Sequence, residues 1–340
     1  MAKVAFVTEQ GAAHRSLYQE ALRDNARVEQ VMLMDPEGAT FEEGRRRCGA
    51  KVTAAETTVD GLLGHGRPEL AIVSLIAAHA PAVIEPLLEA GVHVMAEKPA
   101  CTDPDQFAQL VQVAERRGVH LMLAFAQRCQ PAKTDARRII AEGGIGSLYA
   151  VQAVQVDDQG RIPGHVARGG WTFRKQLAGG GHLTWLGIHT LDQVRFLTGA
   201  EIEAVQAMTA VVGGQPIDVE DLALVNFRFA GGAHGSLFSG YLLDAKPGPG
   251  AITVYGSAGW LRINAAERGQ LEWNATGSPR RVVRYSEPGG GYGRWVERTL
   301  QACLGEAEPP VTAHDGLAAL RVAHAAYRSA AEGRTVTVTP

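Results

Sequence analysis

The chain has few cysteines, and none of them are paired in sequence. Among 340 residues there are four, Cys48, Cys101, Cys129 and Cys303, and no two form a CxxC motif. This pattern argues against a disulfide scaffold and is typical of reduced thiols. The first residues lead at once into an apolar run, so we expect no signal peptide and a cytoplasmic protein.

The chain also lacks a membrane-length apolar run and a basic face. A membrane helix needs about 20 consecutive apolar residues, and a nucleic-acid-binding protein needs a basic stripe. Here 33 Lys and Arg are balanced by 36 Asp and Glu, and the only basic run is 45–47. We therefore expect no membrane and no nucleic-acid partner. With 46% hydrophobic residues, the length suits roughly two domains with sizeable cores.

A third absence is the glycine fingerprint that usually follows the first strand of a dinucleotide-binding domain. The helix after that strand can hold a pyrophosphate on its N-terminus, normally within GxGxxG. The three glycine positions here hold Thr8, Gln10 and Ala13, and the one glycine, Gly11, is out of phase. Glu9 adds a negative charge, which is unfavourable beside phosphate unless it turns away. This turn alone does not predict a nucleotide site.

What the chain does have, over residues 1–126, is an alternation of short apolar runs with helical spacing. Leu17, Ala21 and Leu22 are expected on one face of the first helix. The rhythm predicts an α/β domain with a parallel sheet and helices on both faces. Strands are predicted at 4–7, 28–34, 70–75, 92–96 and 121–125, and helices at 12–25, 42–48, 81–90 and 104–117.

Residues 127–340 follow a different pattern, in which period-two alternation and glycine turns dominate. A second, α+β domain with a mostly antiparallel sheet is predicted, including a hairpin turn at 229–233. The final helix should pack back on the first domain. Strands are predicted at 150–156, 204–212, 221–229 and 235–241, and helices at 132–142, 183–197 and 316–331.

Two polar residues follow predicted strands of the first domain. Lys98, in Glu97-Lys98-Pro99, comes just after strand 92–96 and should point into the crevice where open α/β sheets bind ligands. Burial lowers the pKa of a lysine, so it is our candidate for proton transfer. Asp35 ends the second strand, where an acid binds the adenosine ribose and disfavours a 2′-phosphate, which favours NAD over NADP. Asp35 could equally be a turn residue before Pro36.

The second domain carries a candidate constellation after the glycines at 179–181. In the helix that follows His182, the residues Trp185, His189 and Asp192 are spaced to share one face. A histidine beside a lysine can handle protons. The alternative is a core helix whose Asp192 holds His189. The glycines, which permit close backbone approach, favour a site.

Two further residue types were weighed. His182 and His189 lie about 10 Å apart along a helix axis, so no metal site is expected. Arg174 is a candidate substrate contact or, equally, a surface charge in a loop.

Taken in this order and spacing, the motifs resemble those of the Gfo/Idh/MocA oxidoreductase family over nearly the whole chain. The carrying segments are Glu97-Lys98-Pro99, the glycines 179–181, Gly187-Ile188-His189-Thr190-Leu191-Asp192, Tyr255-Gly256-Ser257-Ala258-Gly259 and 326–333.

The resemblance implies a Rossmann domain at 1–126 and a substrate-binding domain with a large open sheet at 127–340. In the family that sheet forms an oligomer interface, which implies a homodimer or homotetramer. The implied activity is NAD(P)-dependent hydride transfer at a carbinol of a sugar, polyol or similar small molecule. The catalytic residues would be Lys98 and His189, with a cis bond before Pro99.

The remaining implied residues form two sets. The cofactor set is Thr8, Gln10, Gly11, Ala12, Asp35, Ser74 and Glu97, with Glu97 near the nicotinamide. The substrate set is Trp185, Arg174 and Asp192.

Three departures from the family pattern support rival functions. The phosphate-loop glycines are absent, Trp185 replaces an acid, and Ala126 replaces an asparagine. One rival is a binding or regulatory protein on a dehydrogenase frame. Another is a redox-neutral lyase or epimerase with a retained cofactor.

Overall fold

The computed structural model describes residues 1–167, 169–243, 250–264, 269–285 and 291–339. The chain forms two compact units. The first unit comprises Met1–Ala126, Gln176–Gly179 and Gly291–Leu317, and the second comprises Gln127–Lys175, Gly180–Gly290 and Ala318–Pro340. The assignment of 1–126 to the cofactor and 127–340 to the substrate stays a prediction, because compactness does not define function.

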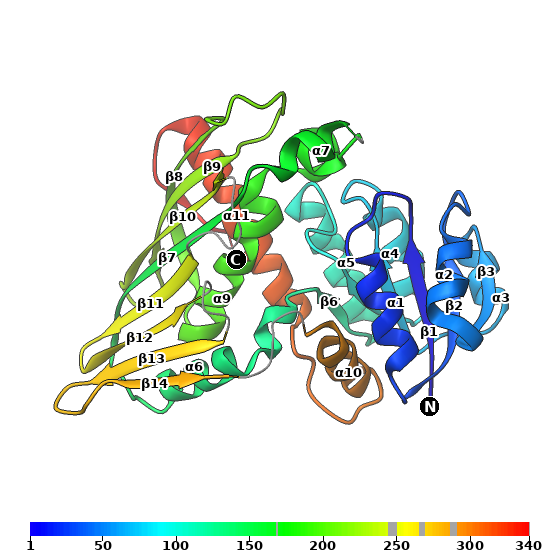
Figure 1. Cartoon of the computed structure of the whole chain (residues 1–340), viewed down its shortest axis with the longest axis horizontal. Helices are drawn as coiled ribbons and strands as arrows, with labels where there is room; N and C mark the ends of the chain where they lie inside the picture. The colour runs from blue at the N-terminus through cyan, green and yellow to red at the C-terminus, as the bar shows by residue number, and fades with distance from the viewer. Residues whose placement is uncertain (168, 244–249, 265–268, 286–290, 340) are drawn as a thin grey trace. The chain divides into compact units, whose positions relative to one another are not determined.

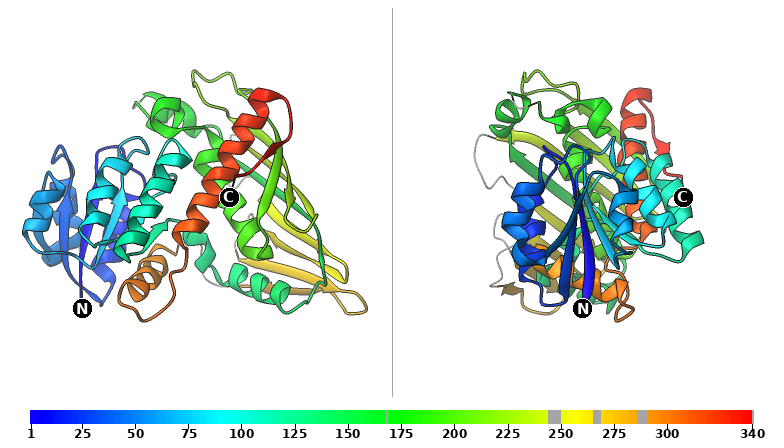
Figure 2. Two further views of the ribbon diagram at one scale, coloured as in Figure 1. Left: turned by 180° about the vertical axis from the view of Figure 1, so that it is seen from behind. Right: turned by 90° about the vertical axis from the view of Figure 1, so that its right-hand side faces the viewer.

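The first unit is built on a parallel sheet of order β3-β2-β1-β4-β5-β6. Helices α1 and α2 flank one face of this sheet, and α4 and α5 flank the other (Figures 1 and 2). This confirms the predicted α/β architecture. The strands are β1 Ala2–Thr8, β2 Val28–Met34, β3 Val52–Glu56, β4 Leu70–Ser74, β5 His93–Ala96 and β6 Leu121–Leu123, and the helices are α1 Arg15–Asp24, α2 Phe41–Cys48, α3 Val59–Gly64, α4 Ala80–Glu89, α5 Pro104–Arg117 and α10 Tyr292–Cys303.

The predicted face of the first helix is correct for Ala21 and Leu22, which are buried, and wrong for Leu17. Leu17 is 40% exposed, whereas Tyr18 and Leu22 are fully buried. Helix α1 begins at Arg15, after His14 takes a left-handed conformation with φ 57°, and not at residue 12. Tyr18 and Leu22 are four residues apart and lie on one side of the helix, whereas Leu17 lies about 100° around the axis from Tyr18.

Three elements of this unit were not predicted from the sequence. Strand β3 is partly buried along most of its length and shows no apolar alternation. Helix α3 is short and weakly apolar, and α10 follows a glycine-rich stretch that suggested a loop. In the structure α10 packs on α1, so the first unit recruits a segment far along the chain.

The second unit contains a nine-stranded sheet of order β14-β13-β12-β11-β7-β10-β9-β8-β15. Among the described strands of this second sheet, only β7 and β10 pair in parallel, which confirms a mostly antiparallel sheet. The predicted hairpin joins β9 to β10. The strands are β7 Leu148–Asp158, β8 Ile202–Ala210, β9 Leu222–Phe229, β10 His234–Leu243, β11 Gly250–Gly256, β12 Gly259–Asn264, β13 Gln270–Ala275, β14 Arg281–Arg284 and β15 Val336–Thr337.

Helices cover one face of this sheet. They are α6 (Pro131–Ala141), α9 (Ile188–Thr198) and the later part of α11 (Ala313–Glu332), which supplies Val322 and Ala326 to the core (Figure 1). The other face bears no described helix in either view (Figure 2). The packing of the final helix on the first domain stays a prediction.

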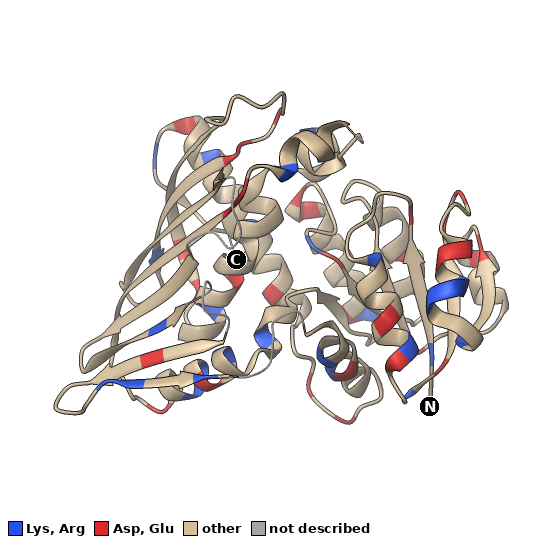
Figure 3. Cartoon of the chain, in the orientation of Figure 1, with Lys and Arg blue, Asp and Glu red and all other residues tan. Residues whose placement is uncertain are grey.

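Charges of both signs are interspersed on each unit (Figure 3). Among the described residues, no helix combines the length and apolar character that crossing a membrane requires.

Helix α1 offers a matched test of the buried face. We expect Leu22→Ala to lower the free energy of unfolding by about 2–5 kcal/mol, because a fully buried side chain leaves a cavity. Leu17→Ala, the same change on the exposed side, should alter it by less than about 0.5 kcal/mol. Urea unfolding measures both. Equal effects of the two variants would contradict the assigned face.

Candidate functional site

The carboxyl ends of three neighbouring strands, β1, β4 and β5, bring together three of the predicted cofactor residues, Thr8, Ser74 and Glu97. Thr8 at the end of β1 pairs in register with Ser74 at the end of β4, and Val73 pairs with Ala96, just before Glu97. The strand order reverses direction between β1 and β4. Open α/β sheets bind ligands at such a switch point.

The turn after β1 contains a buried hydroxyl and a single glycine. The Thr8 hydroxyl is buried and has no hydrogen-bond partner among the described residues. Gly11 has φ +87°, and a Cβ added there would meet no atom within 4 Å. Gln10 is exposed and Ala12 is partly buried. The His14 side chain at the N-cap makes no capping hydrogen bond to α1. The Thr8 hydroxyl, which has no partner among the described residues, is compatible with a bound pyrophosphate.

The Glu9 side chain is held by two contacts outside this turn. Its Oε1 accepts a 2.7 Å hydrogen bond from the Ile76 backbone N–H, and its Oε2 lies 2.9 Å from His79 Nδ1. Both partners belong to the segment after β4. The negative charge of Glu9 is therefore held across the switch point.

The carboxylate of Asp35 is fully buried in the turn that leads to α2. Oδ1 accepts from the Glu37 N–H, and Oδ2 accepts from both the N–H and the hydroxyl of Thr40, each at 2.7 Å. These contacts are those of a turn residue, the alternative left open by the sequence. A ribose contact by Asp35 stays a prediction.

Glu97 lies at the centre of a buried polar cluster. Its Oε1 accepts the Tyr18 hydroxyl at 2.7 Å and lies 2.9 Å from His14 Nδ1. The Tyr292 ring packs against both neighbours, at centroid distances of 5.0 Å from Tyr18 and 5.3 Å from His14. Burial alone would raise the pKa of Glu97, but His14, Lys98 and the Tyr18 hydroxyl together hold it below its ordinary value.

Lys98 follows directly and is 2% exposed. Its backbone N–H contacts Glu97 Oε2 at 3.2 Å, and the Lys98–Pro99 peptide bond is cis, as the resemblance implied. The catalytic role of Lys98 stays a prediction. Its approach to His189 also stays a prediction, because the two residues belong to different units.

In the second unit, the predicted helix face is interrupted. Residues Leu183–Gly187 form a π-helical turn before α9, so the α-helical spacing does not hold across it. Trp185 packs against the apolar cluster around Phe173 and Tyr241 and meets Trp171 edge-on, with ring centroids 5.1 Å apart. His189 is partly buried at the start of α9.

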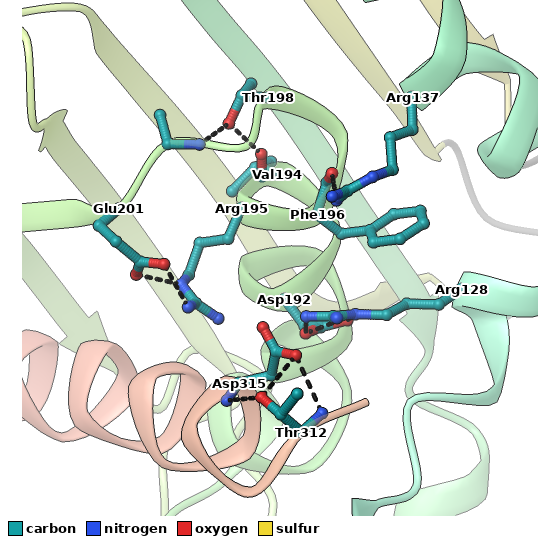
Figure 4. A network of polar contacts seen from close by, with 11 residues as sticks. Arg128, Arg137, Asp192, Val194, Arg195, Phe196, Thr198, Glu201, Thr312 and Asp315 are labelled. Carbon is teal, nitrogen blue, oxygen red and sulfur yellow. Dashed lines mark hydrogen bonds and ion pairs between the residues drawn. The ribbon is translucent and has the colours of Figure 1, made fainter. Parts of the chain in front are cut away.

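Asp192, further along α9, is paired with an arginine (Figure 4). The Arg128 guanidinium donates hydrogen bonds to both carboxylate oxygens of Asp192, at distances of 2.5 to 3.1 Å. The Asp192 side chain is 1% exposed and that of Arg128 is 7% exposed. Close by in sequence, Gln127 Oε1 accepts from buried Lys133 at 2.6 Å. Burial lowers the pKa of Lys133 to about 7. The predicted substrate contact of Asp192 stays a prediction.

The glycines before this helix approach the protein itself. A Cβ at Gly180 would lie 2.2 Å from the Tyr327 hydroxyl, and one at Gly181 would lie 2.0 Å from the Glu220 carbonyl. The Glu220 carboxylate accepts the backbone N–H groups of Gly181 and Leu183. Close packing inside the unit therefore explains why glycine occupies these two positions.

Sequence reasoning missed a hydrogen-bonded chain centred on His182. The imidazole is fully buried, with Nδ1 2.8 Å from Ser239 Oγ and Nε2 3.1 Å from Asp157 Oδ2. Burial would raise the pKa of Asp157, but the His182 contact lowers it. Residues 157 and 239 belong to β7 and β10. No local motif marks them, because only the pairing of those strands brings them together.

Arg174 lines a pocket of about 390 Å³ in the second unit. Apolar side chains and Asp218 form much of the rest of the wall, and the Asp218 carboxylate accepts the Lys175 N–H at 2.6 Å. This setting suits a substrate contact, which stays a prediction.

The described parts of the chain hold no group of three His, Cys, Asp or Glu side chains arranged for a metal ion.

Comparison with known proteins relates both units to one group. Residues 5–125 match the profile described as an oxidoreductase family with an NAD-binding Rossmann fold, and residues 134–262 match the GFO/IDH/MocA C-terminal domain. Levoglucosan dehydrogenase of Pseudarthrobacter phenanthrenivorans is 27% identical over segments covering 74% of this chain and 70% of the relative. Inositol 2-dehydrogenase of Rhizobium meliloti is 27% identical, with 75% and 76% coverage.

A solved structure shows the same fold over the whole length. The oxidoreductase domain protein from Kribbella flavida has a TM-score of 0.89 and 22% identity, and the match covers 100% of both chains.

The Glu97 cluster predicts a specific pH dependence. Because the pKa of Glu97 is lowered on folding, its charge stabilises the folded state above the ordinary glutamate value of about 4.3. That stabilisation is lost as the pH falls through the folded-state value. Glu97→Gln should lower the free energy of unfolding at pH 7 by about 1–3 kcal/mol.

The Glu97→Gln variant should also lose less stability on acidification, which urea unfolding at a series of pH values measures. Glu29→Gln, an exposed control, should follow the wild type. An unchanged acid limb in the Glu97→Gln variant would show that this carboxyl is not the titrating group.

Proposed function

Because the chain belongs to the GFO/IDH/MocA oxidoreductase family, as its motifs predicted, we propose that it is an NAD(P)-dependent dehydrogenase. Its substrate would carry a carbinol, as in a sugar, a polyol or a related small molecule. The related levoglucosan and inositol dehydrogenases support this substrate class.

One observation carries the proposal: Lys98 is buried at the carboxyl end of β5, beside the switch point of an NAD-binding fold. An amine at that position can take the hydroxyl proton of a carbinol as the carbon–hydrogen bond breaks. The carbinol then becomes a carbonyl, and its proton ends on Lys98 Nζ. In the reverse direction Lys98 returns the proton to the forming hydroxyl.

The cofactor supplies the hydride acceptor when bound. Around it, the Thr8 hydroxyl and the Gly11 backbone would hold the pyrophosphate, with Gln10 and Ala12 in the same turn and Ser74 at the end of the neighbouring β4. The family profile supports an NAD site. We favour NAD over NADP because the acid Asp35 ends β2.

On the substrate side, His189 would orient the reacting oxygen. Trp185 offers an apolar ring surface and Arg174 a cation at the rim of its pocket. Asp192 would contribute through Arg128, which it holds in place. The scattered cysteines, which form no CxxC motif, support a cytoplasmic enzyme.

Lys98→Met tests the central assignment. We expect turnover to fall by at least about a hundredfold, the size of a lost general base, while NADH binding changes little. Stopped-flow assays and NADH fluorescence titration measure these two quantities. Lys51→Met, a lysine that contacts backbone carbonyls in the described structure, should keep full activity. Full activity in the Lys98→Met enzyme would remove that residue from the mechanism.

The uncovered face of the nine-stranded sheet suits an oligomer interface. Met208, Leu224 and Phe238 are cross-strand neighbours on β8, β9 and β10, and they are 71%, 38% and 38% exposed. Contiguous exposed apolar side chains mark interaction surfaces. A homodimer or homotetramer through this face would bury them.

Phe238→Glu should therefore shift the protein to a smaller species in analytical ultracentrifugation, because a charge would be buried in the interface. Leu17→Glu, at a matched 40% exposure on α1, should leave the assembly unchanged. A Phe238→Glu protein that keeps the wild-type mass would rule out this face.

A further inference from the structure

Three hydrogen bonds connect the turn after β1 to the end of β4 and the segment that follows it, directly across the switch point. Two involve Glu9, whose carboxylate is held by the Ile76 N–H and by His79. The third is donated by the Ser74 hydroxyl to the Ala13 carbonyl, at 2.5 Å. A dinucleotide that follows the usual path across the crevice must therefore pass beside a fixed carboxylate.

The position of Glu9 in the turn makes its charge relevant to phosphate. It lies between Thr8 and Gln10, two positions where the usual fingerprint brings bare backbone close to the pyrophosphate. Its side chain is only 16% exposed, so water screens the charge weakly. Like charges in a poorly screened site repel.

The charged groups around Glu9 compensate only part of its charge. His79 is 51% exposed. The Arg15 guanidinium donates to the Glu9 carbonyl rather than to its carboxylate, and its other nitrogen pairs with Glu43 at 2.9 Å. This permanent cation is thus already engaged by another acid.

We propose that the Glu9 carboxylate sets the cofactor affinity of this enzyme by opposing the pyrophosphate of the dinucleotide. This rests on the proposed dehydrogenase function. The consequence is that removing this negative charge strengthens dinucleotide binding.

Glu9→Gln isolates the charge, because glutamine can still accept the Ile76 N–H and reach His79. We expect the variant to bind NADH and ADP-ribose about tenfold more tightly, with no change for adenosine, which has no phosphate. Fluorescence titration and calorimetry at two salt concentrations measure this. Glu89→Gln, the same change at the far end of α4, where Glu89 pairs with Arg116 and Arg117, serves as the control and should bind as the wild type does.

A second variant protects the test against a folding defect. His79→Lys places a permanent cation beside Glu9 and should also tighten ADP-ribose binding, by several fold. If the wild type binds NADH but neither variant binds more tightly, the inference fails and Glu9 is only a structural connection. If neither the wild type nor Glu9→Gln binds NADH, NADPH or ADP-ribose, the proposed dehydrogenase function itself fails.

Discussion

Hydrogen bonding between β1, β4 and β5 in parallel determines which residues can meet at the edge of the first sheet. The register places Thr8 of β1 beside Ser74 of β4. It also pairs Val73 of β4 with Ala96 of β5, so that Glu97 follows at the same edge of the sheet. Residues separated by more than 60 positions in sequence thereby share one crevice. Every chemical assignment in this unit depends on that convergence, because the turn after β1 carries no recognisable phosphate motif.

The first unit provides hydrogen-bond partners for the carboxylates that it places after β1 and β5. Glu9 is drawn to the segment after β4, and the buried Glu97 is paired with His14 and Tyr18. An unpaired buried carboxylate would be costly. These partners connect the turn after β1 and helix α1 to the segments that follow β4 and β5.

In the second unit, several buried polar residues find their partners within the unit itself. Asp192 is neutralised by Arg128, Glu220 accepts backbone N–H groups at the start of a π-helical turn, and the glycines before it make room for Tyr327. A buried polar group must find a partner, and these partners come from distant strands and helices. Spacing along one helix could not reveal them.

The sequence alone determined the order of most strands and helices, the two-part organisation and the family. Apolar periodicity and glycine punctuation depend on neighbours in the chain, so α5 was predicted at its observed bounds of 104–117. The Glu97-Lys98-Pro99 motif, which is also local in sequence, predicted that a polar segment follows strand 92–96. Only the tertiary structure decided the surroundings of each functional group. Three examples are the contacts of Asp35 within its turn, the hydrogen bond from the Ile76 N–H to Glu9, and the buried pair of Asp192 with Arg128. They follow from strand register and from the packing of helices on the sheets. These are long-range interactions, which local spacing in the sequence does not encode.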